Sequence, residues 1–352
     1  MVERKKPMGD KWTDFVLQWQ NSDHAGKVKL AESYGVTYDT AKHHISEGRT
    51  DRVVSKKVVK PYFKTEEPCS NLPLRLNTGS NLVTFAIIGD THHPYQDDKT
   101  LENVEKFLEE AQPDYLIYNG DINDFYQVSV FDKDPSRLGS LQKDLDISTE
   151  MFARHQRILP DTTKFFIEGT HEHRWFKYLR QCAPALAKLD GTNVTELYKL
   201  EKFGITYVPF ERGILINEIF LVLHGDMVSI HSSYTAKRQY EKNGGCGMCN
   251  HTHRGGSYYK RDRFGIWGWW ENFCLCSLNP DWIQNPDWTQ GFSLVHFSGD
   301  RFWVEQIPIV DSSFIYGGKV YGKNDNMRLV KKEEARTSSK GEYARAVDCK
   351  HA

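Results

Sequence analysis

The 352-residue chain lacks any long apolar run, since no stretch of about 18 hydrophobic residues, the length that crosses a bilayer, occurs in it. Its first residues, Met1–Lys6, carry charge where a signal peptide has an apolar segment. An excess of one charge is also missing, because 46 Lys and Arg residues face 47 Asp and Glu. These absences predict a cytoplasmic protein with no membrane partner, and they exclude nucleic-acid binding by overall charge alone.

A disulfide framework is absent as well. The seven cysteines are odd in number and irregularly spaced, which fits a reducing compartment. Cys246-x-x-Cys249 with Cys274-x-Cys276 allows a structural zinc site, but Cys274 and Cys276 alternate with apolar residues as in a strand, so we favour buried free thiols. With 39% hydrophobic residues, the chain has enough apolar surface for a core, which excludes wholesale disorder.

Residues 1–50 are expected to form a small helical module that resembles a helix-turn-helix. Apolar residues recur there at helical spacing, and a small residue is followed four positions later by a glycine and then by a capping threonine. The residues that carry this pattern are Trp12, Phe15, Val16, Trp19, Ala31, Gly35, Val36, Thr37, Ala41 and Ile45.

The second helix of this module would present Tyr38, Thr40, Lys42 and His43 to a partner, which suits a DNA major groove. The alternative is a helical hairpin that packs on the main domain, and the short pattern does not decide between the two. Residues 51–80 mix lysines with prolines and are predicted to be a linker or extended arm. Over residues 1–80 there are 14 Lys and Arg against 10 Asp and Glu, a mild basic bias that favours phosphate contact.

Residues 81–322 are expected to form the main domain, of the α/β class. Short apolar runs alternate there with amphipathic segments and then give way to a strand-rich half, which predicts two sheets packed face to face with helices outside. The expected strands are 82–88, 115–118, 164–167, 205–209, 213–216, 219–223, 255–260, 292–297 and 301–307, and the expected helices 99–110, 141–159 and about 173–189. Residues 323–352 are polar and are predicted to be a flexible tail.

Acidic and histidine clusters follow these strands. Loops at the carboxyl ends of parallel strands converge, so we expect the clusters to meet. Mixed carboxylate and imidazole ligands suit Mn²⁺, Fe²⁺ or Zn²⁺, and a shared carboxylate can hold two such ions. The five clusters are Asp90-Thr91-His92, Asn119-Gly120-Asp121-Ile122-Asn123-Asp124, Glu168-Gly169-Thr170-His171-Glu172-His173-Arg174, His224-Gly225-Asp226 and Asn250-His251-Thr252-His253-Arg254.

In this order the clusters resemble the calcineurin-like metallophosphoesterase family over roughly residues 82–310. The resemblance implies a four-layer α-β-β-α sandwich of two mixed sheets, two divalent ions (Mn²⁺ foremost, with Fe²⁺, Ni²⁺ or Zn²⁺ as alternatives) and hydrolysis of phosphate esters by a metal-bridged hydroxide. It implies that Asp90, His92 and His253 hold one ion, that His224 and His251 hold the other, and that Asp121 bridges them.

The same resemblance makes His171 a catalytic contact of the scissile phosphate and Asp124 a group that orients a ligand. Asn123, His173 and Arg174 are candidates for substrate binding, with a helix-start salt bridge as the alternative for His173 and Arg174. The sequence departs from the family at Thr170, where the family has an asparagine ligand of the second ion. It departs again at Asn250, where the family has a glycine and where we expect an effect on the turn more than on the chemistry.

Three functions of the protein are compatible with these features. The first is a nuclease, a phosphodiesterase acting on nucleic acid, with DNA as a partner. The second is a phosphomonoesterase for phosphoproteins or small phosphorylated molecules, and the third is a catalytically weakened DNA-binding or regulatory protein, motivated by Thr170. An aromatic cluster beside the basic turn at residues 260–263 is able to stack bases, although we favour a core or a rim of packed loops. Its members are Phe264, Trp267, Trp269 and Trp270, followed by Trp282 and Trp288.

Overall fold

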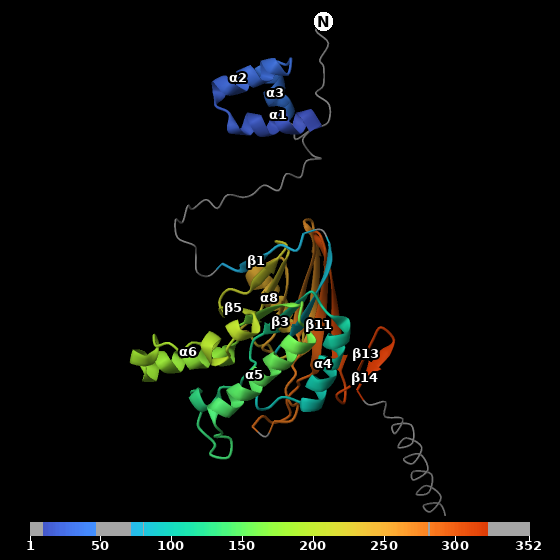
Figure 1. Cartoon of the computed structure of the whole chain (residues 1–352). Coiled ribbons are helices and arrows are strands. Elements are labelled where there is room, and N and C mark those ends of the chain that lie inside the picture. The colour runs from blue at the N-terminus through green and yellow to red at the C-terminus, as the bar shows by residue number, and fades with distance from the viewer. Residues whose placement is uncertain (1–9, 47–71, 80, 281, 323–352) are drawn as a thin grey trace, which may run out of the picture. The chain divides into compact units, whose positions relative to one another are not determined.

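The computed structural model describes residues 10–46, 72–79, 81–280 and 282–322 (Figure 1). The chain divides into two compact units, Met1–Pro68 and Cys69–Ala352. The predicted tail and most of the predicted linker lie outside the described residues. Among those that are described, no helix is both long enough and apolar enough to cross a bilayer.

The first unit contains the helices α1 (Asp10–Asn21), α2 (His24–Ser33) and α3 (Tyr38–Ser46). Its core is formed by Phe15, Trp19, Ala31 and Ala41, all buried. Gly35 adopts φ +71° in the turn between α2 and α3, which confirms the predicted left-handed glycine. Tyr38 differs from the expectation, because its ring stacks on Trp19 at 5.2 Å between centroids and so lies partly in the core, whereas Lys42 is exposed.

The second unit is built on a six-stranded sheet in the order β12-β11-β2-β3-β4-β5. The strands from β2 to β5 are parallel, and β11 and β12 join the β2 edge as antiparallel strands. The bounds are β2 Leu82–Ile88, β3 Tyr115–Asn119, β4 Thr163–Ile167, β5 Ile205–Val208, β11 Gln290–Ser298 and β12 Arg301–Ile309. Each was predicted as a strand, with ends that differ by at most two residues.

A second six-stranded sheet, in the order β1-β6-β7-β8-β10-β9, is also mixed. Its strands are β1 Leu74–Leu76, β6 Ile214–Ile216, β7 Phe220–Leu223, β8 Cys246–Cys249, β9 Gly255–Asp262 and β10 Gly265–Asn272. A small hairpin, β13 Phe314–Tyr316 and β14 Lys319–Tyr321, follows β12. Because β1 pairs with β6, the last part of the predicted linker belongs to this sheet, and the linker boundary at residue 80 is wrong.

The helices cover the outer faces of the two sheets. α4 (Asp98–Ala111) and α5 (Leu141–Ile158) pack on the first sheet through a large apolar cluster that includes Val104, Phe107 and Phe152. α8 (Tyr234–Asn243) contacts β9 and β10 of the second sheet. Between the sheets lies another buried cluster with Phe85, Phe220 and Trp270. This arrangement is the predicted four-layer α-β-β-α sandwich (Figure 1).

The remaining helices are α6 (Thr170–Cys182), the short α7 (Val194–Leu197) and three 3₁₀ turns, Tyr126–Val128, Pro184–Leu186 and Glu201–Phe203. α6 was predicted over about 173–189 but begins at Thr170, directly after β4. It ends before Pro184, whose ring cannot continue a helix. The first turn of α6 therefore carries Thr170, His171 and Arg174 to the end of the first sheet, where the site lies.

Candidate metal centre

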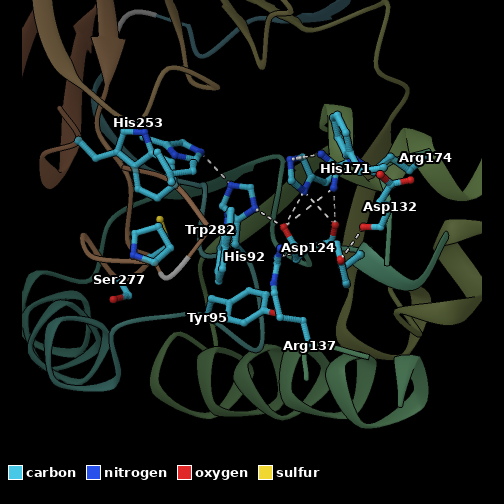
Figure 2. Close-up of a pocket in the computed structure, with 16 residues that line it drawn as sticks. His92, Tyr95, Asp124, Asp132, Arg137, His171, Arg174, His253, Ser277 and Trp282 are labelled. Carbon is cyan, nitrogen blue, oxygen red and sulfur yellow. Dashed lines mark hydrogen bonds and ion pairs between the residues drawn. The ribbon is translucent and has the colours of Figure 1, made fainter. Parts of the chain in front are cut away.

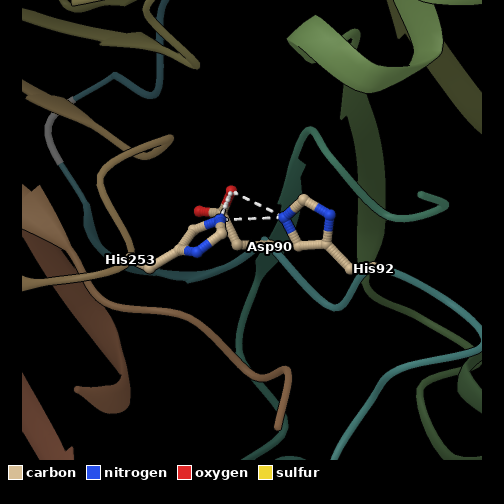
Figure 3. A group of neighbouring side chains, drawn as sticks. All are labelled: Asp90, His92 and His253. Carbon is tan, nitrogen blue, oxygen red and sulfur yellow. Dashed lines mark hydrogen bonds and ion pairs between the residues drawn. The ribbon is translucent and has the colours of Figure 1, made fainter. Parts of the chain in front are cut away.

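Three ligand atoms converge at the end of β2 and form what we call the first ligand group, Asp90, His92 and His253 (Figure 3). The Nε2 atoms of His92 and His253 lie 2.8 Å apart, and Asp90 Oδ1 lies 3.3 Å from His253 Nε2. All three side chains are buried. The group joins residues 161 positions apart, because the loop after β8 meets the loop after β2 across the two sheets.

A second ligand group consists of Asp121, His224 and His251. Asp121 Oδ2 lies 3.0 Å from His224 Nε2 and 3.7 Å from His251 Nδ1. The Nδ1–H of His224 donates to the Asn119 carbonyl at 2.7 Å, which orients Nε2 toward Asp121. His92, Asp121 and His171 also form a close group, so the two ligand groups adjoin through His92 and Asp121.

Thr170 adjoins the second group, next to Asp121 and His251. Its hydroxyl donates to Asp121 Oδ2 at 2.9 Å and lies 3.3 Å from His251 Nδ1. A neutral hydroxyl donates less charge to a cation than an amide oxygen does, so the departure from the family pattern falls directly on the second group.

Backbone strain is concentrated at these ligands. Asp90, His92, Asp121, His251 and His253 all have φ between 48° and 73°, a left-handed conformation that side chains rarely adopt. Close packing holds them there. A Cβ on Gly169 would collide with the backbone and carboxylate of Asp121, and one on Gly120 would collide with the His224 ring, so only glycine fits at either position.

The donor atoms fit a metal site. Asp90 Oδ1 and His224 Nε2 are buried and have no hydrogen-bond partner among the described residues. Buried polar atoms are seldom left in that state unless they meet an ion or a ligand. Oxygen and imidazole donors of this kind match Mn²⁺, Fe²⁺, Ni²⁺ or Zn²⁺ better than Ca²⁺.

The electrostatics also favour cations. Burial opposes charge on Asp90 and Asp121, but the neighbouring His253 and His224 respectively lower the pKa of each carboxyl. Burial opposes charge on His92 too, yet hydrogen bonds to Asp124 and Asp90 raise its pKa to about 10. The charge of Asp121 likewise outweighs burial and raises the pKa of His224 to about 9. Two ionised carboxylates thus lie at the floor of the site.

His171 and Arg174 face the ligand groups from the first turn of α6 (Figure 2). The Nδ1–H of His171 donates to the Asp124 carbonyl at 2.9 Å, and Arg174 Nη2 lies 2.8 Å from His171 Nε2. Burial lowers the pKa of His171 to about 4, so the ring is neutral and the positive charge at this edge comes from Arg174. Asp124 Oδ1 lies 3.0 Å from His171 Nδ1 and 3.4 Å from His92 Nδ1, a position that orients both rings.

The two other candidates for substrate binding lie elsewhere. His173 Nδ1 is 3.4 Å from Glu168 Oε1, and its ring stacks on Phe210. Asn123 is buried, accepts a hydrogen bond from the Phe125 amide and donates weakly to Ser148. Neither lines the cavities beside the ligand groups. These positions point to roles in loop structure, and contact of either residue with substrate stays a prediction.

Asn250 has a larger role than the sequence indicated. Its buried amide donates to Asp90 Oδ2 at 2.7 Å, and its oxygen accepts from Asn119 and Asn272. It therefore orients a member of the first ligand group, which corrects the expectation that it affects mainly the turn. Glu172 belongs to the third cluster, but no role was predicted for it. Its buried carboxylate accepts from the amides of Asp121, Ile122, Asn123 and Gly169 and from the Tyr198 hydroxyl, and so fixes the loop that carries Asp121.

The cysteines contribute no ligand group among the described residues. Cys246, Cys249, Cys274 and Cys276 are all free and buried. Trp269 and Trp270 of the aromatic cluster are buried in the core, whereas Phe264 is exposed.

Comparison with known proteins agrees with this geometry. A sequence model of the calcineurin-like phosphoesterases matches residues 83–283, more than half of the chain. The chain belongs to this family. Membership implies a dinuclear site for divalent metal ions, for which the two ligand groups supply the candidate residues. It also implies phosphate esters as substrates.

Individual relatives are more distant. The Gene 54 protein of Mycobacterium phage D29 is 28% identical over 67% of this chain and 98% of its own length, and that of phage L5 is 26% identical over the same shares. Among solved structures, Vps29 of Entamoeba histolytica with Zn²⁺ aligns with a TM-score of 0.36 and 14% identity over 66% of this chain and 96% of its own. A dimetal phosphatase of Danio rerio aligns with a TM-score of 0.31 and 10% identity over 64% and 95%.

Proposed function

We propose that this protein is a metal-dependent phosphodiesterase that cleaves nucleic acid. The observation that supports it is that the candidate metal centre is hollowed on two sides. A cavity of about 430 Å³ lies beside His92, and another of about 210 Å³ lies beside Asp121 and His251. The two cavities share His171, His253 and Trp288. A phosphodiester carries a group on each side of phosphorus and needs room for both, whereas a monoester needs room for one.

Each ligand group would bind one metal ion. Asp90, His92 and His253 would bind one ion, and His224, His251 and Thr170 the other, with Asp121 shared between them. When bound, such a pair of divalent ions neutralises the phosphate and makes water available as a nucleophile near neutral pH. Mn²⁺ is the ion that we expect first, because the donors mix carboxylate and imidazole.

The residues of the chain have separate tasks around the phosphate. Arg174 supplies positive charge toward the phosphoryl oxygens, and His171 is held beside it as a neutral ring by the Asp124 carbonyl. Asp124 fixes His171 and His92 from behind. Since these contacts exist before substrate binds, little reorganisation is needed when charge develops on phosphorus.

The decisive experiment compares esters on the purified protein. With Mn²⁺ we expect faster hydrolysis of bis-p-nitrophenyl phosphate than of p-nitrophenyl phosphate, and cleavage of a labelled oligonucleotide. Faster turnover of the monoester would favour a phosphomonoesterase instead. No turnover of any ester in Mn²⁺, Fe²⁺, Ni²⁺ or Zn²⁺ would refute the enzyme and leave a binding or regulatory protein.

The N-terminal unit supports nucleic acid as the substrate, because its α2–turn–α3 arrangement has the order of a DNA-binding helix-turn-helix. We expect α3 to contact DNA through Lys42. In a gel-shift assay on the full chain, Lys42→Glu should weaken binding of duplex DNA, while Lys29→Glu on the exposed surface of α2 makes the same charge change and should weaken it less. Equal weakening by the two variants would remove this assignment.

A further inference from the structure

The cavity beside the first ligand group has an aromatic wall that phosphate hydrolysis itself does not need. We propose that this cavity binds one unpaired nucleobase next to the scissile phosphate, so that the protein cleaves single-stranded in preference to paired nucleic acid. This inference rests on the phosphodiesterase function proposed above and specifies its substrate. The aromatic side chains that line the cavity are Tyr95, Tyr126, Phe131, Trp282 and Trp288. Figure 2 labels Tyr95 and Trp282 among them.

Arg137 joins part of this wall into one stack. Its guanidinium lies 3.7 Å from the centre of the Trp282 ring and 4.0 Å from that of Tyr126. The rings of Trp282 and Tyr95 are 4.4 Å apart between centroids. Cation–π contacts of this length hold the rings in place, and Trp282 nevertheless stays 38% exposed. A fixed, partly exposed aromatic ring is the surface on which single-stranded bases stack.

The wall begins at the metal centre. The Trp288 ring lies 4.3 Å from the ring of His253, a member of the first ligand group, and Trp288 lines both cavities. On the other side of the cavity Arg174 contacts both His171 and the ring of Phe131. A phosphate at the ligand groups would therefore have an aromatic surface directly beside it, at the place where an attached nucleoside must lie.

The form of the cavity argues for an unpaired base. At about 430 Å³ it has the size of a small-molecule pocket and accommodates one nucleoside. A base inside a duplex is paired at its edge and covered on both faces by its neighbours, so it cannot offer a face to Trp282 unless it leaves the stack. Arg137 and Arg174 at the same cavity suit the negatively charged backbone of such a strand.

The test measures cleavage of matched oligonucleotides by the full chain with Mn²⁺. One single strand carries thymine at every position around the cleavable phosphates, and the other carries abasic residues on the same backbone. We expect the thymine strand to be cleaved about tenfold faster or more, since a tenfold change corresponds to about 1.4 kcal/mol, within the range of base stacking on an aromatic ring. The same strand in a duplex should be cleaved more slowly.

Variants assign the preference to the cavity. Trp282→Ala should remove most of the thymine preference, and Trp282→Phe should keep most of it. Trp303→Ala removes a tryptophan of β12 that is 54% exposed and lines neither cavity, so it should leave the preference unchanged. Circular dichroism checks that each variant is folded. Fluorescence anisotropy with a labelled thymine strand in EDTA gives a readout without catalysis, in which Trp282→Ala should weaken binding several-fold.

The outcomes separate this inference from the proposed function. Equal cleavage of thymine and abasic strands, or faster cleavage of the duplex, would overturn the base site while leaving the phosphodiesterase in place. An equal loss on both strands in Trp282→Ala would do the same, because it would show a general role for the ring. Failure of every oligonucleotide and of bis-p-nitrophenyl phosphate would overturn both.

Discussion

The two ligand groups contain the same residue types but are held to different degrees. In the first group every side chain is buried, and the Asn250 amide fixes Asp90 from behind. In the second, Asp121 and His224 are fully buried, but the His251 side chain is 21% exposed and Thr170 offers only a hydroxyl. The ligands of the first group are therefore held more rigidly than those of the second, and they are stronger donors. We expect the first group to bind its ion tightly and the second group to bind its ion more weakly.

Asp121 is the ligand that we expect the two groups to share. Its substitution should therefore lower activity more than any other change considered below. Asp121→Asn removes a buried negative charge that adjoins His224, His251 and Thr170 and lies beside His92. We expect kcat for bis-p-nitrophenyl phosphate to fall on the order of 10²–10³-fold, as when one stabilising group of an active site is removed. Metal content measured by mass spectrometry should fall from two ions per chain to one or none.

Asp226→Asn is the matched control, because it makes the same change at an exposed carboxylate that pairs with Lys242. Its activity should match that of the unmodified protein. If Asp121→Asn kept its activity, Asp121 would not be the shared ligand, and the two ligand groups would have no residue in common.

Asn250 distinguishes the groups through its side chain, which bonds to Asp90 of the first group and to no ligand side chain of the second. Asn250→Ala removes the donor to Asp90 Oδ2, and it removes one of the two acceptors of each of the Asn119 and Asn272 amides. We expect affinity for the first ion to fall about 10–100-fold, the usual cost of losing a group that orients a ligand. Isothermal titration with Mn²⁺ measures this, with Asn243→Ala at the end of α8 as a control. A fall confined to the weaker of the two sites would contradict the assignment.

Removal of metal directly tests whether the two ligand groups differ in their affinity for metal ions. Dialysis of the Mn²⁺-loaded protein against increasing EDTA should release one ion per chain before the other. Midpoints about tenfold or more apart would correspond to a difference of about 1.4 kcal/mol in binding. Loss of both ions in one step would show that the groups are equivalent despite Thr170.

Much of this centre was predictable because its ligands are local to strand ends. The apolar run of β2 stops at Gly89 and is followed at once by Asp90 and His92, and each later cluster also follows a strand. Parallel pairing of β2, β3 and β4 brings the first three clusters together. The grouping with the clusters after β7 and β8 was implied by the resemblance to the family, not by the order of the strands.

What the sequence did not indicate depends on contacts between distant residues. The amide of Asn250 reaches Asp90 across 160 positions, and the Glu172 carboxylate reaches the Asp121 loop across 51. Neither contact leaves a periodic pattern. α8 was not anticipated because it buries only Thr235, Ala236 and Gln239, so it has no apolar stripe. β1 has three residues, too few for alternation to be visible.

Substitution of Thr170 should have the smallest effect, because restoring the family residue should raise the metal affinity of the second group alone. Thr170→Asn replaces a hydroxyl beside Asp121 and His251 with an amide oxygen, a better donor to a divalent ion. We expect affinity for the second ion to rise several-fold, up to about tenfold, since a hydrogen bond or ligand contact with a charged partner is worth roughly 1.5–3 kcal/mol and the new side chain must also be ordered. The measurement is the EDTA titration above, in which the EDTA concentrations at which the two ions are released should become closer.

Thr170→Val is the control, because it keeps the size of the side chain and removes the hydroxyl. It should move the two release midpoints further apart. If Thr170→Asn instead weakened the second ion, the hydroxyl would be acting through its hydrogen bond to Asp121 rather than as a poor ligand, and the weakness of the second group would have to come from the exposure of His251.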